Sequence, residues 1–356
     1  MNGCPPKCPG CRYIDLPYNE TLNKKFDFIQ NHFKKWHNKI QSIRFSEKNI
    51  LNYRKKVILN VKYNQNSWIF GMVLKNDVID ISDCPIHNEI VKNSILLLKE
   101  ILPSYKLFPL HFYLQYDKQI ALIVKTKENI NTEWIETYSN EFNKMGIEGI
   151  WLHKNPSAGK RIFEKTPLEL VYGKHVSINE NNIYYSIGAF QQLIPELYNE
   201  ALTETKQFFG NENYILDLYS GSGTSLKIWS SFTNTLGVEL NGMSFKIALL
   251  NVSSALILRG KCSERLPQIE SWINENKKNQ INLFVNPPRI GIEKEVIDWI
   301  VKDRIPEKIA YLSCSPGTLL RDLEKISSLY EVIKIIPYDF FPYTHHIENL
   351  VLLRKL

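Results

Sequence analysis

Two short segments near the C-terminus carry side chains that are suited to covalent chemistry. Tyr311-Leu-Ser-Cys314-Ser-Pro-Gly-Thr318 presents a thiol and Phe341-Pro-Tyr-Thr-His-His-Ile-Glu348 presents a carboxylate, each at the expected end of a strand. A thiolate can add to an electron-poor carbon, and a carboxylate can later remove a proton so that the thiol is eliminated. The pair therefore indicates an enzyme in which Cys314 is the nucleophile and Glu348 is the base.

A glycine-rich turn earlier in the chain predicts a cofactor site. Leu216-Asp-Leu-Tyr-Ser-Gly-Ser-Gly223 follows an apolar run and precedes a helical pattern, and its glycines let the backbone approach a ligand closely. Glu239 ends the next expected strand, where a carboxylate can accept hydrogen bonds from a ribose diol. This spacing fits a dinucleotide site and an S-adenosylmethionine site equally well.

The segment Asn286-Pro-Pro-Arg289 favours the second kind of site. A strand that ends in Asn-Pro-Pro places an amide and rigid carbonyls at the lip of the site, because proline fixes its own φ. Such a turn is common where a methyltransferase holds its acceptor base. Arg289 itself fits a contact with the target nucleotide or its phosphate, or a salt bridge that stabilises the turn.

These side chains together fit the methylation of a pyrimidine ring. Uracil C5 is too weak a nucleophile to take a methyl group directly, but a thiolate that adds to C6 makes the ring nucleophilic at C5. A base must then remove the C5 proton before the thiol can leave. Since the pKa of a free cysteine is about 8.5, the surroundings of Cys314 have to activate it.

The cysteines form a second pattern. Three of the six, Cys4, Cys8 and Cys11, lie within eight residues at the N-terminus, unlike the even, dispersed framework of a secreted disulfide protein. In a reducing compartment such a cluster more often binds a metal. No signal segment or membrane span is evident, so we expect a cytoplasmic protein.

The composition is that of a soluble globular protein, and 356 residues are enough for two domains. Residues 1–60 hold 12 Lys and Arg against four Asp and Glu, whereas the rest of the chain is nearly neutral. A surface that faces a polyanion and a solvated lysine-rich helix both fit this bias. Charge alone leaves the choice open.

The hydrophobic periodicity divides the chain into two regions with different patterns of secondary structure. A helix is predicted over residues 20–42, followed by a mixed α+β region with strands at 56–63, 67–74, 78–82, 110–115 and 119–126 and helices at 87–102 and 132–146. From about residue 195 strands and helices alternate, with strands at 214–219, 235–239, 281–285, 308–313, 332–337 and 349–354. Alternation predicts a mostly parallel, doubly wound sheet whose ligands bind at the carboxyl ends of the strands.

Taken in order, these motifs resemble the RNA uracil-C5 methyltransferase family over nearly the whole chain. The resemblance rests on Phe190-Gln191, the turn 217–223, Glu239, Val285-Asn-Pro-Pro-Arg-Ile-Gly291, Ser313-Cys314 and the segment 341–348. The branch that methylates uridine 747 of 23S rRNA is the most similar, because it shares Asn-Pro-Pro-Arg and a very short N-terminus. The likeness implies a C-terminal Rossmann-like S-adenosylmethionine-dependent domain preceded by a mixed α+β domain.

The resemblance also assigns roles to residues. Gln191, Tyr219, Glu239 and Asn286 would hold S-adenosylmethionine, Cys314 would be the nucleophile, and Glu348 would abstract the proton. Ribosomal members carry an iron–sulfur cluster, so Cys4, Cys8, Cys11 and Cys84 would hold a 4Fe–4S cluster. The chain departs from the family in its first cysteine spacing, in Gln192-Leu193 after the Phe-Gln pair, and around Cys262-Ser263.

The implied organisation has three parts: a cluster loop at 1–15, an α+β RNA-binding domain at 16–185 and a methyltransferase domain at 186–356. We expect a monomer that acts on RNA, rRNA or tRNA, away from membranes. Three alternatives are a radical S-adenosylmethionine enzyme, from the C-x3-C-x2-C spacing, an RNA cytosine-C5 methyltransferase, and an inactive cluster-bearing RNA-binding protein. Arg289 stands where cytosine enzymes usually have a second cysteine.

Overall fold

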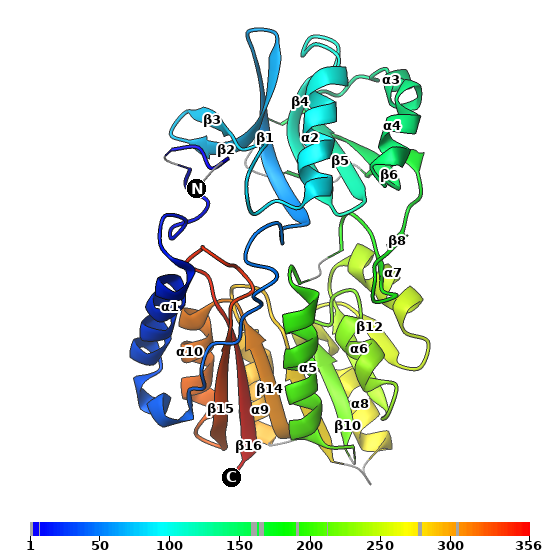
Figure 1. Cartoon of the computed structure of the whole chain (residues 1–356). Coiled ribbons are helices and arrows are strands. Elements are labelled where there is room, and N and C mark those ends of the chain that lie inside the picture. The colour runs from blue at the N-terminus through cyan, green and yellow to red at the C-terminus, as the bar shows by residue number, and fades with distance from the viewer. Residues whose placement is uncertain are drawn as a thin grey trace. The chain divides into compact units, whose positions relative to one another are not determined.

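The chain divides into two compact units, which are described separately (Figure 1). The computed structural model describes residues 3–6, 8–157, 162–163, 167–189, 192–211, 213–276, 280–303 and 306–356. The first unit comprises Met1–Asp15 and Lys48–Ile187, and the second comprises Leu16–Glu47 and Gly188–Leu356. No helix in the described part of the chain is long and apolar enough to cross a membrane.

The first unit is built on a seven-stranded sheet of order β3-β2-β1-β4-β5-β6-β7. Its strands are β1 (Lys56–Asn64), β2 (Ser67–Leu74), β3 (Asp77–Asp80), β4 (Leu110–Tyr116), β5 (Gln119–Val124), β6 (Gly149–Lys154) and β7 (Glu169–Gly173). Neighbouring strands are antiparallel except β5 and β6. Gln65 and Asn66, both at positive φ, form the two-residue β1–β2 turn, a conformation that matches the twist of paired strands.

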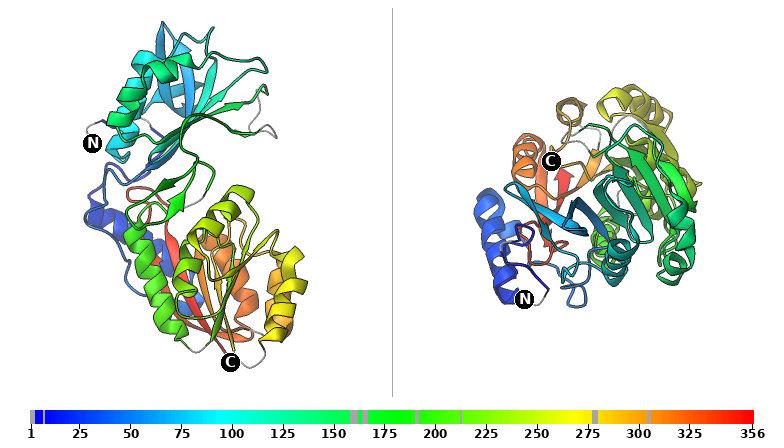
Figure 2. Two further views of the ribbon diagram at one scale, coloured as in Figure 1. Left: turned by 90° about the vertical axis from the view of Figure 1, so that its right-hand side faces the viewer. Right: turned by 90° about the horizontal axis from the view of Figure 1, so that it is seen from above.

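Helices cover one face of this sheet, as Figure 2 shows. They are α2 (Glu89–Ile101), α3 (Glu133–Thr137) and α4 (Ser139–Lys144), and a small ribbon of β8 (Ser177–Ile178) and β9 (Tyr184–Tyr185) follows the sheet. The side chain of Asn88 caps α2 by accepting the Ile90 N–H at 3.2 Å. Val91, Ile95 and Leu98 then recur at helical spacing and are buried, which fixes the face that α2 presents to the core.

The second unit contains the alternating region that the sequence predicts. Its seven strands have the order β12-β11-β10-β13-β14-β16-β15. They are β10 (Tyr214–Leu218), β11 (Thr235–Glu239), β12 (Leu256–Arg259), β13 (Ile281–Val285), β14 (Pro306–Ser313), β15 (Tyr330–Tyr338) and β16 (Glu348–Lys355). The first five in spatial order run parallel, and β16 is antiparallel to both β14 and β15. The predicted Rossmann-like sheet is confirmed.

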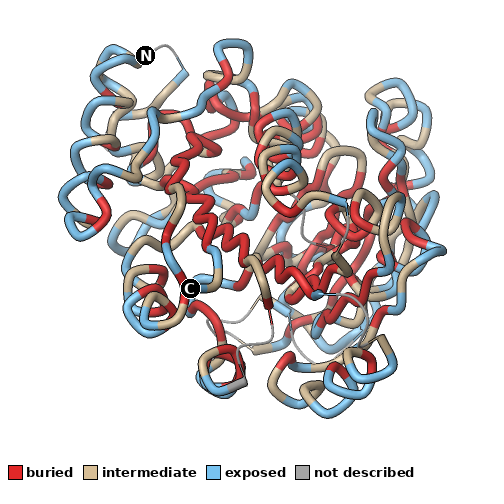
Figure 3. Tube along the Cα trace, turned by 90° about the horizontal axis from the view of Figure 1, so that it is seen from below, coloured by how far each residue is buried: buried red, intermediate tan, exposed pale blue. Residues whose placement is uncertain are grey.

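Helices pack on both faces of the second sheet, whose strands are largely buried (Figure 3). One face is covered by α1 (Tyr18–His32), α8 (Leu266–Glu275), α9 (Lys294–Asp303) and α10 (Pro316–Ile326), whose apolar side chains join the main core. On the other face lie α5 (Pro195–Phe209), α6 (Thr224–Trp229) and α7 (Gly242–Asn251). Short 3-10 helices occur at Lys34–Lys39 and Ser263–Arg265.

The segment 16–47 belongs to the second unit, and not to the central domain in which it was expected from the sequence. Ile29 and Phe33 enter the core of that unit, and the Gln41 N–H donates to the Ile335 carbonyl at 2.8 Å. β15 is the edge strand of this sheet, and the segment covers part of its edge through the bridges Ile40–Ile335 and Arg44–Tyr338.

Candidate active site

The glycine-rich turn follows β10 and leads into α6. Tyr219, Gly221 and Gly223 all have positive φ, of 62°, 57° and 82°. A Cβ added to Gly223 would lie 3.1 Å from the Cα and Cβ atoms of Ala248 in α7. The turn therefore favours glycine at its last position, because both the backbone angle and the close approach of α7 disfavour a side chain.

Glu239, at the end of β11, holds this turn through backbone donors. Its Oε2 accepts the Gly221 N–H at 2.8 Å, and its Oε1 accepts the Asn241 N–H at 2.5 Å. Burial raises the pKa of the carboxyl group, and the N–H groups of Asn241 and Gly221 lower it in part. Each carboxylate oxygen has a second acceptor site, so Glu239 can also accept hydroxyl groups of a ligand.

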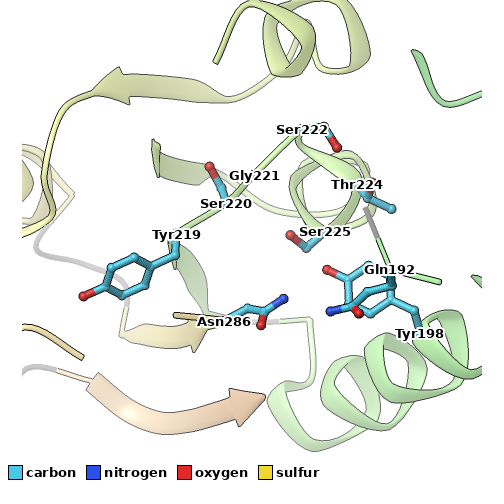
Figure 4. A pocket seen from close by; sticks show the side chains of 9 residues that line it. All are labelled: Gln192, Tyr198, Tyr219, Ser220, Gly221, Ser222, Thr224, Ser225 and Asn286. Atoms are coloured by element: carbon cyan, nitrogen blue, oxygen red, sulfur yellow. The ribbon is translucent and has the colours of Figure 1, made fainter. Parts of the chain in front are cut away.

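A pocket opens beside the turn at the carboxyl ends of β10 and β13 (Figure 4). It is lined by Gln192, Tyr198, Tyr219, Ser220, Gly221, Ser222, Thr224, Ser225 and Asn286. The Asn286 amide points toward Gln192 and Tyr198, whereas the Tyr219 ring points away from the other labelled side chains. The Tyr219 hydroxyl accepts the Glu293 N–H at 3.1 Å.

Two of the predicted cofactor residues, Tyr219 and Asn286, line the pocket. A third, Glu239, accepts a hydrogen bond from the glycine-rich turn beside it. Gln191, the fourth, lies outside the described residues. Sequence reasoning did not identify Tyr198 or Ser225, because a tyrosine or serine inside a helical pattern carries no signal of a ligand.

Asp217 lies within β10 below the turn and is fully buried. Its Oδ2 accepts the indole N–H of Trp229 at 3.1 Å. Burial raises the pKa of the Asp217 carboxyl to about 7, and hydrogen bonds from Ser225 and Trp229 limit that rise. Asp217 thus links the strand to α6, which also contributes Ser225 to the pocket.

The two proposed catalytic residues come together at one edge of the sheet. β14 and β16 run antiparallel, and Ser313 pairs with Asn349, so Cys314, which directly follows β14, lies opposite Glu348, the first residue of β16. Because antiparallel strands bring the end of one to the start of the other, the thiol and the carboxylate meet at the same edge. They also interact electrostatically, since the Glu348 charge raises the pKa of Cys314.

Glu348 is a buried carboxyl group with only 3% of its surface exposed. Its Oε2 has no hydrogen-bond partner among the residues that the structure describes. Burial raises its pKa to about 8, against which the Arg289 guanidinium exerts a lowering effect. A base whose pKa lies near the working pH is well matched to proton abstraction.

Cys314 is half-buried, and burial is also the first cause of its raised pKa. Arg289 opposes that rise both by its charge and by a hydrogen bond. Since Arg289 lowers the pKa of Cys314 and of Glu348, one cation serves both groups. From the sequence, Arg289 was expected to contact the nucleotide or to form a structural salt bridge, and its effect on Cys314 and Glu348 was not predicted.

The N-terminal cysteines belong to the first unit. An added Cβ at Gly3 would clash with the Asp83 carbonyl oxygen, so the loop that carries Cys4 contacts the turn that carries Cys84. The pKa of Cys11 is raised to about 12, by burial first and then by the Cys84 thiol. Among the described residues, however, no three His, Cys, Asp or Glu side chains are placed to hold a metal ion.

The doubly wound sheet with an antiparallel β16, and the glycine-rich turn with a pocket beside it, are the features of a methyltransferase fold. The sequence model of the tRNA (uracil-5-)-methyltransferase family matches residues 17–356. The chain therefore belongs to this family of RNA uracil-C5 methyltransferases and is an enzyme. The resemblance seen in the sequence is confirmed at this level, and the assignment to the 23S rRNA branch stays a prediction.

Relatives agree with the family over almost the full chain. An uncharacterized RNA methyltransferase of Protochlamydia amoebophila is 30% identical over 98% of this chain and 82% of its own length. A tRNA/tmRNA (uracil-C(5))-methyltransferase of Aliarcobacter butzleri is 26% identical over 98% and 97%. The tRNA (uracil-54, C5)-methyltransferase of Pyrococcus abyssi, solved with S-adenosyl-L-homocysteine, has a TM-score of 0.75 at 20% identity, covers 98% and 86%, and shows a shared fold.

Proposed function

We propose that the protein transfers a methyl group from S-adenosylmethionine to C5 of a uridine in RNA, with Cys314 as nucleophile and Glu348 as base. The observation that carries this proposal is the meeting of Cys314, Glu348 and Arg289 at one sheet edge. Tyr198 lies close to both the pocket and these residues, since it lines the pocket and the Glu348 charge raises its pKa. A nucleophile, a base and a cofactor pocket are therefore neighbours within the second unit.

The pocket residues fit S-adenosylmethionine. Glu239 offers acceptors for a ribose diol, Asn286 offers an amide, and Gly221 lines the pocket without a side chain that would keep a ligand at a distance. When bound, S-adenosylmethionine supplies the electrophilic methyl group. Side chains of this protein carry out the nucleophilic attack and the proton removal.

The proposed reaction begins when the Cys314 thiolate attacks C6. An S–C6 bond forms, and the electron pair of the C5–C6 double bond moves into the ring as an enolate. Once C5 carries the methyl group, Glu348 takes the C5 proton, the C5–C6 double bond re-forms, and the S–C6 bond breaks to release the thiolate. Arg289 lies beside both groups and favours their ionised forms.

RNA that carries 5-fluorouridine tests this mechanism, because fluorine at C5 cannot be removed as a proton. With S-adenosylmethionine, the wild-type protein should form a covalent adduct that survives denaturing electrophoresis. Cys314→Ala should form none, whereas Glu348→Gln should still form the adduct, because the attack of Cys314 on C6 does not use the Glu348 carboxylate. Wild-type protein that forms no adduct, or Cys314→Ala that forms as much, contradicts the mechanism.

We propose 23S rRNA as the substrate, on the strength of the N-terminal cysteines and the Asn-Pro-Pro-Arg motif. The second candidate is tRNA, which the name of the Aliarcobacter butzleri relative favours. Mapping 5-methyluridine in the rRNA and tRNA of a deletion strain distinguishes them. A missing modification in 23S rRNA supports the first candidate, and one missing only from tRNA overturns it.

We also propose that Cys4, Cys8, Cys11 and Cys84 hold a 4Fe–4S cluster. Support comes from the number of thiols and from the contact between the N-terminal loop and the turn of Cys84. Anaerobically purified protein should contain about four irons, and Cys84→Ser should contain markedly less. Full iron content in Cys84→Ser would remove this residue from the ligand set.

A further inference from the structure

A buried ion pair joins the N-terminal helix of the second unit to the segment that precedes Glu348. The Lys25 ammonium lies 2.6 Å from Asp339 Oδ1, and the two side chains are 1% and 0% exposed. Removing two charges from water is costly, so a buried pair adds little stability by itself. Its position in the fold is the more informative property.

The pair is the centre of a hydrogen-bond network. The same Lys25 ammonium donates to the Phe341 carbonyl at 3.0 Å, and the Tyr18 hydroxyl donates to Asp339 Oδ2 at 2.9 Å. The Phe341 N–H donates back to Asp339 Oδ1 at 3.2 Å. Helix α1 thereby fixes the backbone from Asp339 to Phe341 through partners more than 300 positions away in the sequence.

This backbone leads to the proposed base. β15 ends at Tyr338, which pairs with Glu348 at the start of β16, and Asp339 is the first residue of the connection between them. Farther along the connection, the Tyr343 ring lies 5.5 Å from the Tyr18 ring, and Tyr343 adopts a φ of 62°. Lys25 and Tyr18 therefore hold the start and the middle of the loop that leads to Glu348.

We infer that Lys25 is a positioning residue for Glu348, acting through the Asp339 ion pair and the backbone of the 339–347 loop. The inference rests on the proposed role of Glu348 as the base. Elimination needs the carboxylate within hydrogen-bond reach of the C5 proton, whereas the attack of Cys314 on C6 does not use Glu348. Loss of the ion pair should therefore slow elimination and leave adduct formation in place.

The test uses the full-length protein with both charges removed. Lys25→Met alone leaves a buried carboxylate without its cation, so the main variant is Lys25→Met/Asp339→Asn, with Tyr18→Phe as a milder second variant. Lys39→Met is the matched control, because Lys39 also joins the N-terminal segment to the same edge strand, through an exposed ion pair with Glu331 at 3.0 Å. Thermal melting establishes that each variant is folded.

We expect the double variant to lose about 10- to 100-fold in turnover on ordinary uridine RNA, the range that small misplacement of a catalytic group costs. Adduct formation with 5-fluorouridine RNA should stay close to the wild-type rate. The decisive signature is a covalent adduct that accumulates on ordinary uridine RNA, which a purely structural defect does not produce. Tyr18→Phe should change in the same direction by less, and Lys39→Met should behave as wild type.

Three results overturn the inference: wild-type turnover in the folded double variant, equal loss of turnover and adduct formation, or no accumulated adduct on ordinary RNA. If the double variant fails to fold, Tyr18→Phe decides by the same criteria. Failure of the proposed function is a separate result, since wild-type protein would then form no adduct with 5-fluorouridine RNA.

Discussion

Replacing Glu348 by glutamine should abolish turnover and yet stabilise the protein at alkaline pH. The carboxyl group is buried, its Oε2 lacks a hydrogen-bond partner among the described residues, and burial raises its pKa from 4.5 to about 8. A base of this kind is kept in an environment that opposes its charged form. Glutamine has nearly the same shape and stays neutral at every pH.

The magnitude follows from the two pKa values. The difference between 4.5 and about 8 corresponds to at most about 5 kcal/mol, at about 1.4 kcal/mol for each pK unit. Below pH 4.5 the Glu348 carboxyl is protonated in both the folded and the unfolded chain. Between 4.5 and about 8 the folded chain holds a proton that the unfolded chain has lost, so the free energy of unfolding falls as the pH rises.

Urea unfolding of wild type and Glu348→Gln at pH 5 and pH 8.5 measures this effect. The two proteins should differ little at the lower pH, and Glu348→Gln should unfold at distinctly higher urea at the upper pH. Glu331→Gln is the control, because the Glu331 side chain is 51% exposed and should bring no such gain. The same difference at both pH values, or none at either, would refute the buried, high-pKa base.

Two further predictions concern the neighbours of the site. Because Arg289 lowers the pKa of both Glu348 and Cys314, Arg289→Gln should shift the rise of kcat/KM with pH to higher pH. Each pK unit of this shift should reduce kcat/KM at pH 7 by about tenfold. A pH profile that does not shift would contradict the effect of Arg289 on the two groups. Gly223→Ala should cost about 1–2 kcal/mol of backbone strain and weaken S-adenosylmethionine binding in calorimetry, since its Cβ would crowd Ala248. Gly146→Ala, with a similar φ of 79° and open space around it, should share the strain and keep the affinity, and equal losses from both variants would refute the local argument.

The strands of the catalytic sheet could be predicted where they are short, apolar and flanked by turns. The expected strands 235–239 and 281–285 agree with β11 and β13 in full. Strand β12 was missed, because Leu256–Arg259 is a four-residue edge strand that is buried at only one of its positions. Hydrophobic alternation needs more residues and more burial than this strand offers.

The partner of an amphipathic helix could not be predicted in the same way. Periodicity identifies the apolar face of residues 20–42 but not the sheet that receives it, and α1 packs on the second unit rather than on the first. Lys25 is one of the buried residues of that helix, and its partner Asp339 lies 314 positions farther along the sequence. No local pattern reports a contact over such a separation.

The candidate site, too, could be predicted from the sequence only in part. Cys314 and Glu348 could be named from their types and motifs, and the register of β14 with β16 places them together. The effect of Arg289 on both groups and the participation of Tyr198 in the pocket depend on how four chain segments meet. Such convergence becomes visible only in the folded protein.

The central claim is that Cys314 attacks the uracil ring, and peptide mass spectrometry of the trapped adduct tests it most directly. After reaction with S-adenosylmethionine and 5-fluorouridine RNA, nuclease and protease digestion should leave a methylated fluoropyrimidine nucleotide on the peptide that contains Cys314. Of the six cysteines, this one alone should carry it. A nucleotide on another cysteine, or on none, would contradict the account.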